Sequence, residues 1–286
     1  ELHRQSGVAA VMLMAMRDGT HEYKPKKDED KTLPIKPEYY YKVADALKID
    51  VEFKPHFNSG NYAKVVERLK YIQSKKRRLL IDSRDSGAGK TYSLEDIAAN
   101  DPRFLYIKNT SLMKGRDMIE LLLEKFGIKN ERMSNAKRLS LIAQKCMVQP
   151  GFCMAWDEME KAGPDIWRVV KDVEDATHGK VGFALSGMDI INDLHKLASN
   201  KKGIFRQLNR RFRGNKLMLS AFSAKDVKAG LAEYNITDPG VVSLLSRVIL
   251  DFDMLSEFVI DIQEHLIVPG HTVDVANVKQ LFDLQP

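Results

Sequence analysis

Four residues in one short segment, Gly87, Gly89, Lys90 and Thr91, have the types and spacing that bind the phosphates of a nucleotide. They follow the apolar run Leu79-Leu80-Ile81 and form the Gly-Lys-Thr end of a P-loop. In such a loop the backbone N–H groups surround a β-phosphate, the lysine reaches the β- and γ-oxygens, and the threonine hydroxyl binds Mg²⁺. The sequence therefore predicts ATP or ADP and Mg²⁺ as cofactors. The expected nucleotide contacts are Asp85, Ser86, Gly87, Ala88, Gly89, Lys90, Thr91 and Tyr92.

Arg84 departs from the P-loop pattern, which has glycine at that position. Glycine permits a φ that a side chain resists, so we expect a displaced loop or slow hydrolysis. The alternative to a P-loop is a chance Gly-Lys-Thr in an ordinary loop. The apolar run before it and the helical pattern from Thr91 to Ala99 favour the P-loop, because a helix N-terminus stabilises a bound anion.

A second chemical pair, Asp157-Glu158, ends the apolar run from Phe152 to Trp156. This is a Walker B pattern, in which the aspartate holds Mg²⁺ through water and the glutamate orients and deprotonates the attacking water. An isolated Asp-Glu after apolar residues is common, but its place one helix-strand-helix layer after a P-loop favours catalysis. We therefore predict Thr91 and Asp157 as metal residues and Lys90, Asp157 and Glu158 as catalytic residues.

Ser186 lies near the end of another apolar run, Val181 to Gly187. A small polar side chain at the carboxyl edge of the sheet can help to place water between Asp157 and the γ-phosphate, the role called sensor 1. The alternative is a serine that only caps a turn.

Positive charge is concentrated in two segments. Every charged residue between Leu194 and Lys225 is a cation, and a run of four cations precedes the P-loop strand. Such segments suit the phosphates of DNA, although a solvated surface is the alternative. The candidate DNA-binding residues are Lys75, Lys76, Arg77, Arg78, Lys201, Lys202 and Arg206.

The elements that must position these residues alternate between strands and helices, which predicts an α/β fold with a parallel five-stranded sheet covered by helices on both faces. Strands are expected at the P-loop run and at 103–108, 151–156, 181–186 and 216–222. Helices are expected at 62–74, 116–126 and 136–147. From Ala224 the pattern is wholly helical, with helices at 225–234, 241–250, 256–266 and 273–282 that form a lid.

Residues 1–56 form a separate small helical domain, divided from the rest by composition. Two helical patterns, Leu2 to Arg17 and Glu38 to Leu47, flank a charged stretch, Tyr23 to Lys31, that is typical of a solvated loop. The first pattern resembles a phage-repressor helix-turn-helix with Gly7 in the turn. The chain begins in the middle of this motif, so we expect its natural N-terminus to be missing. The remaining domains are a nucleotide-binding core at 57–223 and the lid at 224–286.

The composition is that of an ordinary globular protein, with 44% apolar and 29% charged residues and a net charge of +6 in 286 residues. Membrane spans and secretory signals are not predicted, because apolar runs of the required length are missing. We therefore expect a cytoplasmic location in a bacterial host. Cys146 and Cys153 are expected to be reduced thiols in the core.

Together the P-loop, Asp157-Glu158, Ser186, the arginine-rich segment and the helical tail resemble the AAA+ ATPases. With a helix-turn-helix appended before this AAA+-like part, the domain order resembles that of the DNA-transposition regulators of the phage Mu B protein, TnsC and IstB type. The resemblance implies an ATP-dependent homo-oligomer, a filament or ring on double-stranded DNA, that partners a transposase. It also implies an arginine that completes the neighbouring subunit's site, for which Arg210 or Arg211 is the candidate; contact with DNA phosphate is the competing role.

The lid departs from the AAA+ pattern at 251–257, where many members carry a sensor 2 arginine and this sequence has no cation. Our leading hypothesis is an ATPase that delivers target DNA to a transposase and stimulates it. Two alternatives stay open: a replication initiator or helicase loader, and a nucleotide-gated interaction module with negligible hydrolysis.

Overall fold

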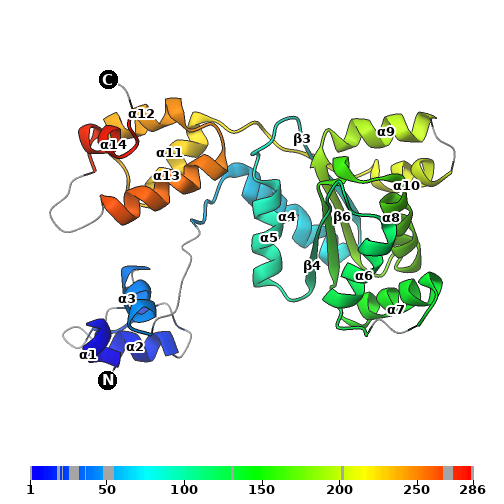
Figure 1. Cartoon of the computed structure of the whole chain (residues 1–286), viewed down its shortest axis with the longest axis horizontal. Coiled ribbons are helices and arrows are strands. Elements are labelled where there is room, and N and C mark those ends of the chain that lie inside the picture. The colour runs from blue at the N-terminus through cyan, green and yellow to red at the C-terminus, as the bar shows by residue number, and fades with distance from the viewer. Residues whose placement is uncertain are drawn as a thin grey trace. The chain divides into compact units, whose positions relative to one another are not determined.

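A computed structural model describes residues 2–17, 20, 22–25, 32–35, 37–47, 55–129, 132–200, 203–266 and 273–284. The chain divides into two compact units, Glu1–Lys54 and Pro55–Pro286 (Figure 1). The boundary lies two residues before the one predicted. The predicted core and lid both belong to the second unit.

The described residues of the first unit form the helices α1 (Leu2–Ser6), α2 (Ala10–Arg17) and α3 (Pro37–Leu47). Gly7 lies between α1 and α2 with φ +67°, a left-handed conformation that suits glycine in the predicted turn. A short antiparallel pair, β1 (Glu22–Tyr23) and β2 (Leu33–Pro34), flanks the charged stretch and was not predicted. The role of this unit as a helix-turn-helix stays a prediction.

The second unit is built on a parallel five-stranded sheet with strand order β4-β5-β6-β3-β7, which confirms the predicted fold. Its central strands are apolar on both faces, as expected for a sheet covered by helices on each side. The strands are β3 (Arg78–Ser83), β4 (Phe104–Lys108), β5 (Cys153–Asp157), β6 (Gly182–Met188) and β7 (Lys216–Met218). β7 is shorter than predicted because the chain turns away after Leu219, where Ser220 binds Asn61.

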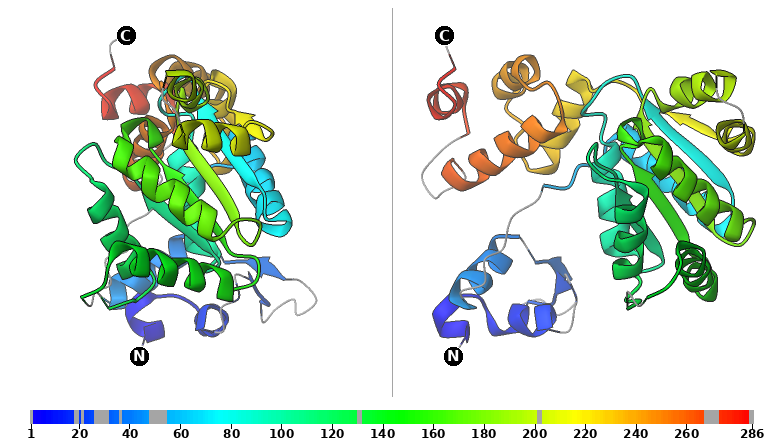
Figure 2. Two further views of the ribbon diagram at one scale, coloured as in Figure 1. Left: turned by 90° about the vertical axis from the view of Figure 1, so that its right-hand side faces the viewer. Right: turned by 45° about the vertical axis from the view of Figure 1, so that its right-hand side comes forward.

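Two helical layers cover the sheet (Figure 2). α4 (Gly60–Lys75) and α5 (Lys90–Asn100) share one apolar core with one face of the strands. The other face packs against α6 (Gly115–Lys125), α7 (Asn135–Val148), α8 (Pro164–Ala176), α9 (Ile190–Asn200) and α10 (Ile204–Phe212). Stacked Trp156 and Phe183 are fully buried in this second core. A short 3₁₀ helix, η1 (Met159–Lys161), follows β5.

The lid consists of α11 (Ala224–Glu233), α12 (Pro239–Val248), α13 (Phe252–His265) and α14 (Val275–Leu281). α13 starts four residues before the predicted Ser256, because the Asp251 carboxylate accepts a hydrogen bond from the Met254 N–H and caps the helix there. The predicted reduced thiols are confirmed: Cys146 and Cys153 are free and buried, and burial raises the pKa of Cys146 to about 12.

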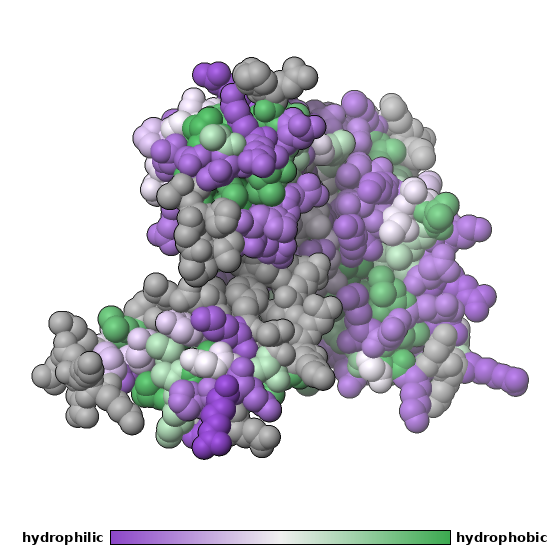
Figure 3. Space-filling model, turned by 60° about the vertical axis from the view of Figure 1, so that its left-hand side comes forward, coloured by the Kyte–Doolittle hydropathy of each residue, from purple (hydrophilic) through white to green (hydrophobic). Residues whose placement is uncertain are grey.

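The molecular surface is mostly hydrophilic on the face in Figure 3, where apolar atoms form small separate groups. Among the described helices, none combines the length and the apolar character that a membrane span requires.

Candidate functional site

The P-loop joins the carboxyl end of β3 to the start of α5. Gly87 and Gly89 have φ of +73° and +83°, so these two positions favour glycine for conformational reasons. α5 starts at Lys90, and within the described chain no side chain caps its first N–H groups. These donors can therefore bind an anion. Asp85 and Ser86 are exposed in the loop, whereas Ala88 is buried and its carbonyl oxygen accepts a hydrogen bond from Asn61.

Lys90 points back across the loop, and its ammonium donates a hydrogen bond to the Ser83 hydroxyl. Ser83 in turn donates to the Asp85 carbonyl oxygen at 2.7 Å. Burial lowers the pKa of Lys90, and the nearby carboxylates, Asp157 first, oppose that shift. A bound phosphate would raise the pKa of Lys90 further, because it adds negative charge beside the ammonium group.

Arg84 is exposed and is not among the described non-glycine residues with left-handed backbone, which are Lys76, Glu158, Asp189, Asn235 and Asp283. Arg84 therefore occupies the first P-loop position without a positive φ. Because the displaced loop is expected from a positive φ at this position, that expectation does not apply in this conformation. Slow hydrolysis stays a prediction.

Thr91, in the first turn of α5, meets Asp157 at the carboxyl end of β5. The Thr91 hydroxyl donates to Asp157 Oδ2 at 2.7 Å, and the Tyr106 hydroxyl reaches the same oxygen at 3.2 Å. Asp157 is 1% exposed, and its Oδ1 has no hydrogen-bond partner among the described residues. A buried carboxylate oxygen without a donor costs free energy unless a cation or water binds it. This donor set fits Mg²⁺, which prefers carboxylate, hydroxyl and water oxygens.

Glu158 follows Asp157 in a left-handed conformation, with φ +55°. Such backbone strain in a non-glycine residue is frequent at functional sites. The Glu158 carboxylate forms an ion pair with Lys161, and its second oxygen lies 3.7 Å from the Lys108 ammonium. The candidate base is thus paired with two cations in this conformation.

Ser186 lies on β6 beside the end of β5, one residue after Leu185, which pairs with Trp156. It is fully buried, and within the described chain its hydroxyl has no hydrogen-bond partner. Asn109 was not predicted, but it is fully buried directly after β4 and donates its backbone N–H to the Asp157 carbonyl at 3.1 Å. Its side-chain amide donates to the Glu158 carbonyl at 3.4 Å. An asparagine immediately after a predicted strand was the available signal.

The first turn of α13 lies against the P-loop. A Cβ added to Gly87 would be 2.5 Å from the Asp251 Cβ, and one added to Gly89 would be 3.4 Å from the Phe252 ring. Asp251 belongs to the lid segment 251–257, where the resemblance to AAA+ ATPases predicts a sensor 2 arginine. Phe252 also contacts an aromatic group formed with Phe57 and Phe222.

The candidate arginines lie elsewhere in the unit. Arg211 is 19% exposed and binds Glu174 and Asp175 of the same chain. Arg210 is exposed and lines a hollow of about 370 Å³ together with Arg206 and Arg213. Of the two, Arg210 is therefore better placed to reach another subunit, and the trans role stays a prediction.

The candidate DNA-binding residues before the P-loop strand lie at the opposite end of β3 from the phosphate-binding loop. Lys75, Lys76 and Arg77 are exposed, and Arg78 is half-buried at the start of the strand. Lys201 and Lys202 lie outside the described residues. The described members thus form a basic surface separate from the predicted ATP site.

No protein-family model matches the sequence, and no curated protein is significantly similar to it. A Walker-type ATPase of Pyrococcus abyssi superposes with a TM-score of 0.52 at 14% identity, over 82% of this chain and 75% of that one. Two RuvB variants of Thermotoga maritima superpose with TM-scores of 0.50 at 15% and 14% identity, over 79% of this chain and 69% of theirs. This likeness shows the fold alone, a five-stranded parallel α/β architecture covered by helices.

Proposed function

We propose that this protein is an AAA+ ATPase that binds ATP and Mg²⁺, oligomerises on double-stranded DNA, delivers that DNA to a transposase and stimulates it. The observation that carries the ATPase assignment is the meeting of Thr91 and Asp157, where one carboxylate oxygen is bound and the other has no partner among the described residues. A structural aspartate in the core would be expected to have both oxygens satisfied.

Each side chain has a distinct task in the proposed reaction. Lys90 binds the β- and γ-oxygens of ATP, and Thr91 and Asp157 hold Mg²⁺, which neutralises charge developing on the phosphoryl oxygens when bound. Glu158 accepts a proton from the attacking water after Lys161 and Lys108 release its carboxylate. Ser186 binds the same water through its hydroxyl, which has no partner within the part of the chain that the structure describes.

The test is ATP binding by calorimetry and phosphate release by a coupled assay, with and without Mg²⁺. We expect Lys90→Ala to abolish binding, and Glu158→Gln to lower turnover by about 100-fold or more while ATP stays bound. Glu124→Gln, an exposed carboxylate on α6, is the matched control and should match the parent chain. Unchanged turnover in Glu158→Gln would remove Glu158 from the mechanism.

Support for the DNA and transposase assignment comes from the cation-only segment around α10, the basic run before β3 and the small helical unit that precedes the core. Electron microscopy with a linear duplex and either ATP, ADP or no nucleotide tests assembly. Filaments or rings only with ATP and DNA are expected. A strand-transfer assay with the transposase of the same mobile element then tests delivery.

A nucleotide-gated module with negligible turnover is the second candidate. Two contacts favour it, the pairing of Glu158 with Lys161 and the packing of Asp251 against Gly87. The Glu158→Gln variant separates the two candidates, because a gated module would bind ATP and change shape without any loss of turnover on substitution.

A further inference from the structure

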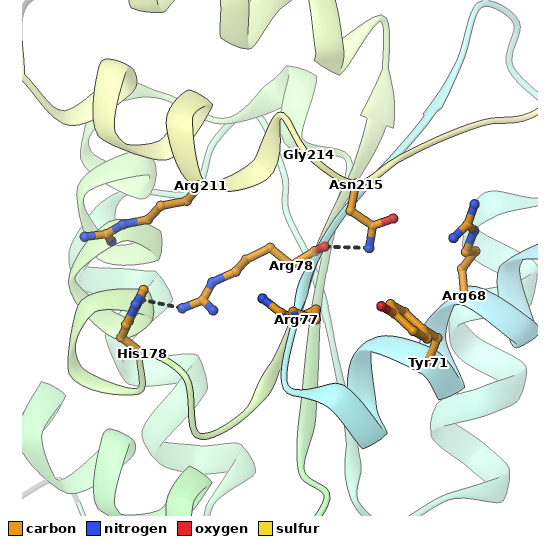
Figure 4. Close-up of a pocket in the computed structure, with 8 residues that line it drawn as sticks. All are labelled: Arg68, Tyr71, Arg77, Arg78, His178, Arg211, Gly214 and Asn215. Atoms are coloured by element: carbon orange, nitrogen blue, oxygen red, sulfur yellow. Dashed lines mark hydrogen bonds between the residues drawn. The ribbon is translucent and has the colours of Figure 1, made fainter.

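A pocket rich in arginine lies at the amino ends of β3 and β7, at the opposite edge of the sheet from the P-loop (Figure 4). Its volume is about 530 Å³. Arg68 and Tyr71 project from α4 on one side, whereas Arg78, Arg211 and His178 meet on the other. None of the residues that line this pocket is acidic.

Two of the arginines are held in place by a buried carboxylate. Glu174, at 1% exposure, accepts a hydrogen bond from Arg78 Nε at 2.7 Å and also binds Arg211. Arg78 also donates to His178 Nδ1 at 2.6 Å. Because Glu174 fixes both guanidinium groups, their remaining N–H donors are oriented before any ligand arrives.

The other two arginines supply positive charge that the protein does not neutralise. Arg68 and Arg77 are exposed, and in the part of the chain that the structure describes neither forms an ion pair. Lys75 and Lys76 follow Arg68 on the same segment and are exposed as well. The pocket therefore has a surplus of positive charge after Glu174 and Asp175, the two carboxylates that bind its other arginines, are counted.

Tyr71 adds an apolar surface to this charged site. Its ring is 46% exposed between Arg68 and Arg77, although large apolar and aromatic side chains are usually buried. The exposed ring can pack against the apolar C–H face of a sugar while the neighbouring guanidinium groups bind its phosphate.

We propose that this pocket binds a backbone phosphate of DNA, with the adjoining sugar against Tyr71. The proposal rests on the DNA-binding part of the proposed function and adds a contact at the edge of the sheet remote from ATP. Arg68 and Arg77 bind the phosphate oxygens, and Arg78 and Arg211 stabilise the same charge from the far wall. An acidic side chain of a second subunit is the competing occupant.

The test is the anisotropy of a fluorescent duplex of about 30 base pairs titrated with the full chain, ATP and Mg²⁺ at several salt concentrations. We expect the double variant Arg68→Gln/Arg77→Gln to weaken binding about 10-fold or more and to reduce the salt slope by about 1 to 2. Tyr71→Ala should weaken binding about 5-fold without changing that slope. Lys125→Gln/Lys137→Gln removes the same charge from exposed positions outside the pocket and should change binding by less than about 2-fold.

The outcomes are separable because ATP affinity and light scattering are measured on the same samples. If the parent chain binds no duplex, the DNA-binding part of the proposed function fails and the pocket assignment fails with it. If the parent chain binds but the Arg68/Arg77 variant equals its control, only the pocket assignment is overturned. Loss of self-association by this variant in the absence of DNA would identify a subunit contact and would also overturn it.

Discussion

At the scale of single residues, the site contains buried polar atoms whose hydrogen bonds are incomplete. Asp157 Oδ1, Ser186 Oγ and Asn109 Oδ1 all lack partners among the residues that the structure describes. All three lie at or near the carboxyl ends of the neighbouring strands β4, β5 and β6. Buried groups of this kind are rare in native cores, so their grouping next to Thr91 indicates a place for water and a cation.

Replacing Arg84 by glycine tests whether the arginine impairs the P-loop. Arg84 is not left-handed, so glycine relieves no strain and we expect ATP affinity and turnover to stay within about 2-fold. Greater freedom of the unfolded chain should lower stability by up to about 1 kcal/mol. Calorimetry and urea unfolding measure both effects, with Arg132→Gly, an exposed position before α7, as the control. A 10-fold rise in turnover would instead show that Arg84 slows hydrolysis, as the sequence pattern predicts.

Asp101 gives a prediction about pH. Hydrogen bonds from Arg103 hold the pKa of this carboxyl well below its ordinary value of about 4, and Gln73 adds another at 3.0 Å. A lowered pKa in the folded state stabilises the fold above pH of about 4, and this contribution is lost as the pH falls toward the folded-state pKa.

Asp101→Asn should therefore lower the urea midpoint at pH 7, and the difference from the parent chain should shrink below pH of about 4. Asp172→Asn, an exposed carboxylate on α8, is the control. A difference between Asp101→Asn and the parent that is equal at pH 7 and pH 3 would contradict the assignment.

The sequence could predict the residues with chemical roles because Gly-Lys-Thr and Asp-Glu are local patterns. It could not predict Asn61, which reaches Ala88 from another helix, or the pairing of Arg211 with Glu174, because these contacts join distant segments. Arg211 shows the limit clearly: its residue type suits phosphate, but its partner is a carboxylate of the same chain.

At the scale of elements, the fold depends on close contact between helices and strands. Gly182 lies where α4 crosses β6, and a Cβ there would be 2.9 Å from both the Ile72 carbonyl oxygen and Cys153 Sγ. Apolar periodicity predicted that α4 covers the sheet, but it carries no information on how closely the helix approaches. Helix boundaries such as the start of α13 depend likewise on a capping contact, here at Asp251.

Gly182→Ala should therefore destabilise the second unit by about 1 to 3 kcal/mol, because the helix backbone must move to admit a methyl group. Gly60→Ala is the matched control, since no atom lies within 4 Å of its added Cβ. Urea unfolding measures both variants. Equal midpoints would mean that α4 shifts freely on the sheet.

At the scale of the whole molecule, the candidate phosphate and metal site lies within one of the two units. Every residue of the phosphate and metal site belongs to Pro55–Pro286, which also has its own apolar cores. The first unit carries equal numbers of acidic and basic residues over 1–56, so general attraction to DNA is expected from the second unit. The charged stretch that follows β1 lies within the first unit and not between the units, so composition alone could not locate the division at Lys54.

Removing residues 1–54 should leave ATP affinity within about 2-fold of that of the full chain, because the site loses no ligand and no core residue. Calorimetry on the shortened and full chains makes the comparison, and thermal unfolding verifies that the shortened chain is folded. Loss of ATP binding by a folded shortened chain would mean that the first unit contributes to the site.

The contact between the P-loop and α13 has a mechanical consequence. Asp251 and Phe252 touch the loop glycines at one end of a 14-residue helix, and such a helix is about 21 Å long. A helix behaves as a rigid rod, so if α13 rotated about its first turn, His265 at its far end would be displaced the most. The contact therefore ties the orientation of the longest lid helix to the space beside Gly87 and Gly89.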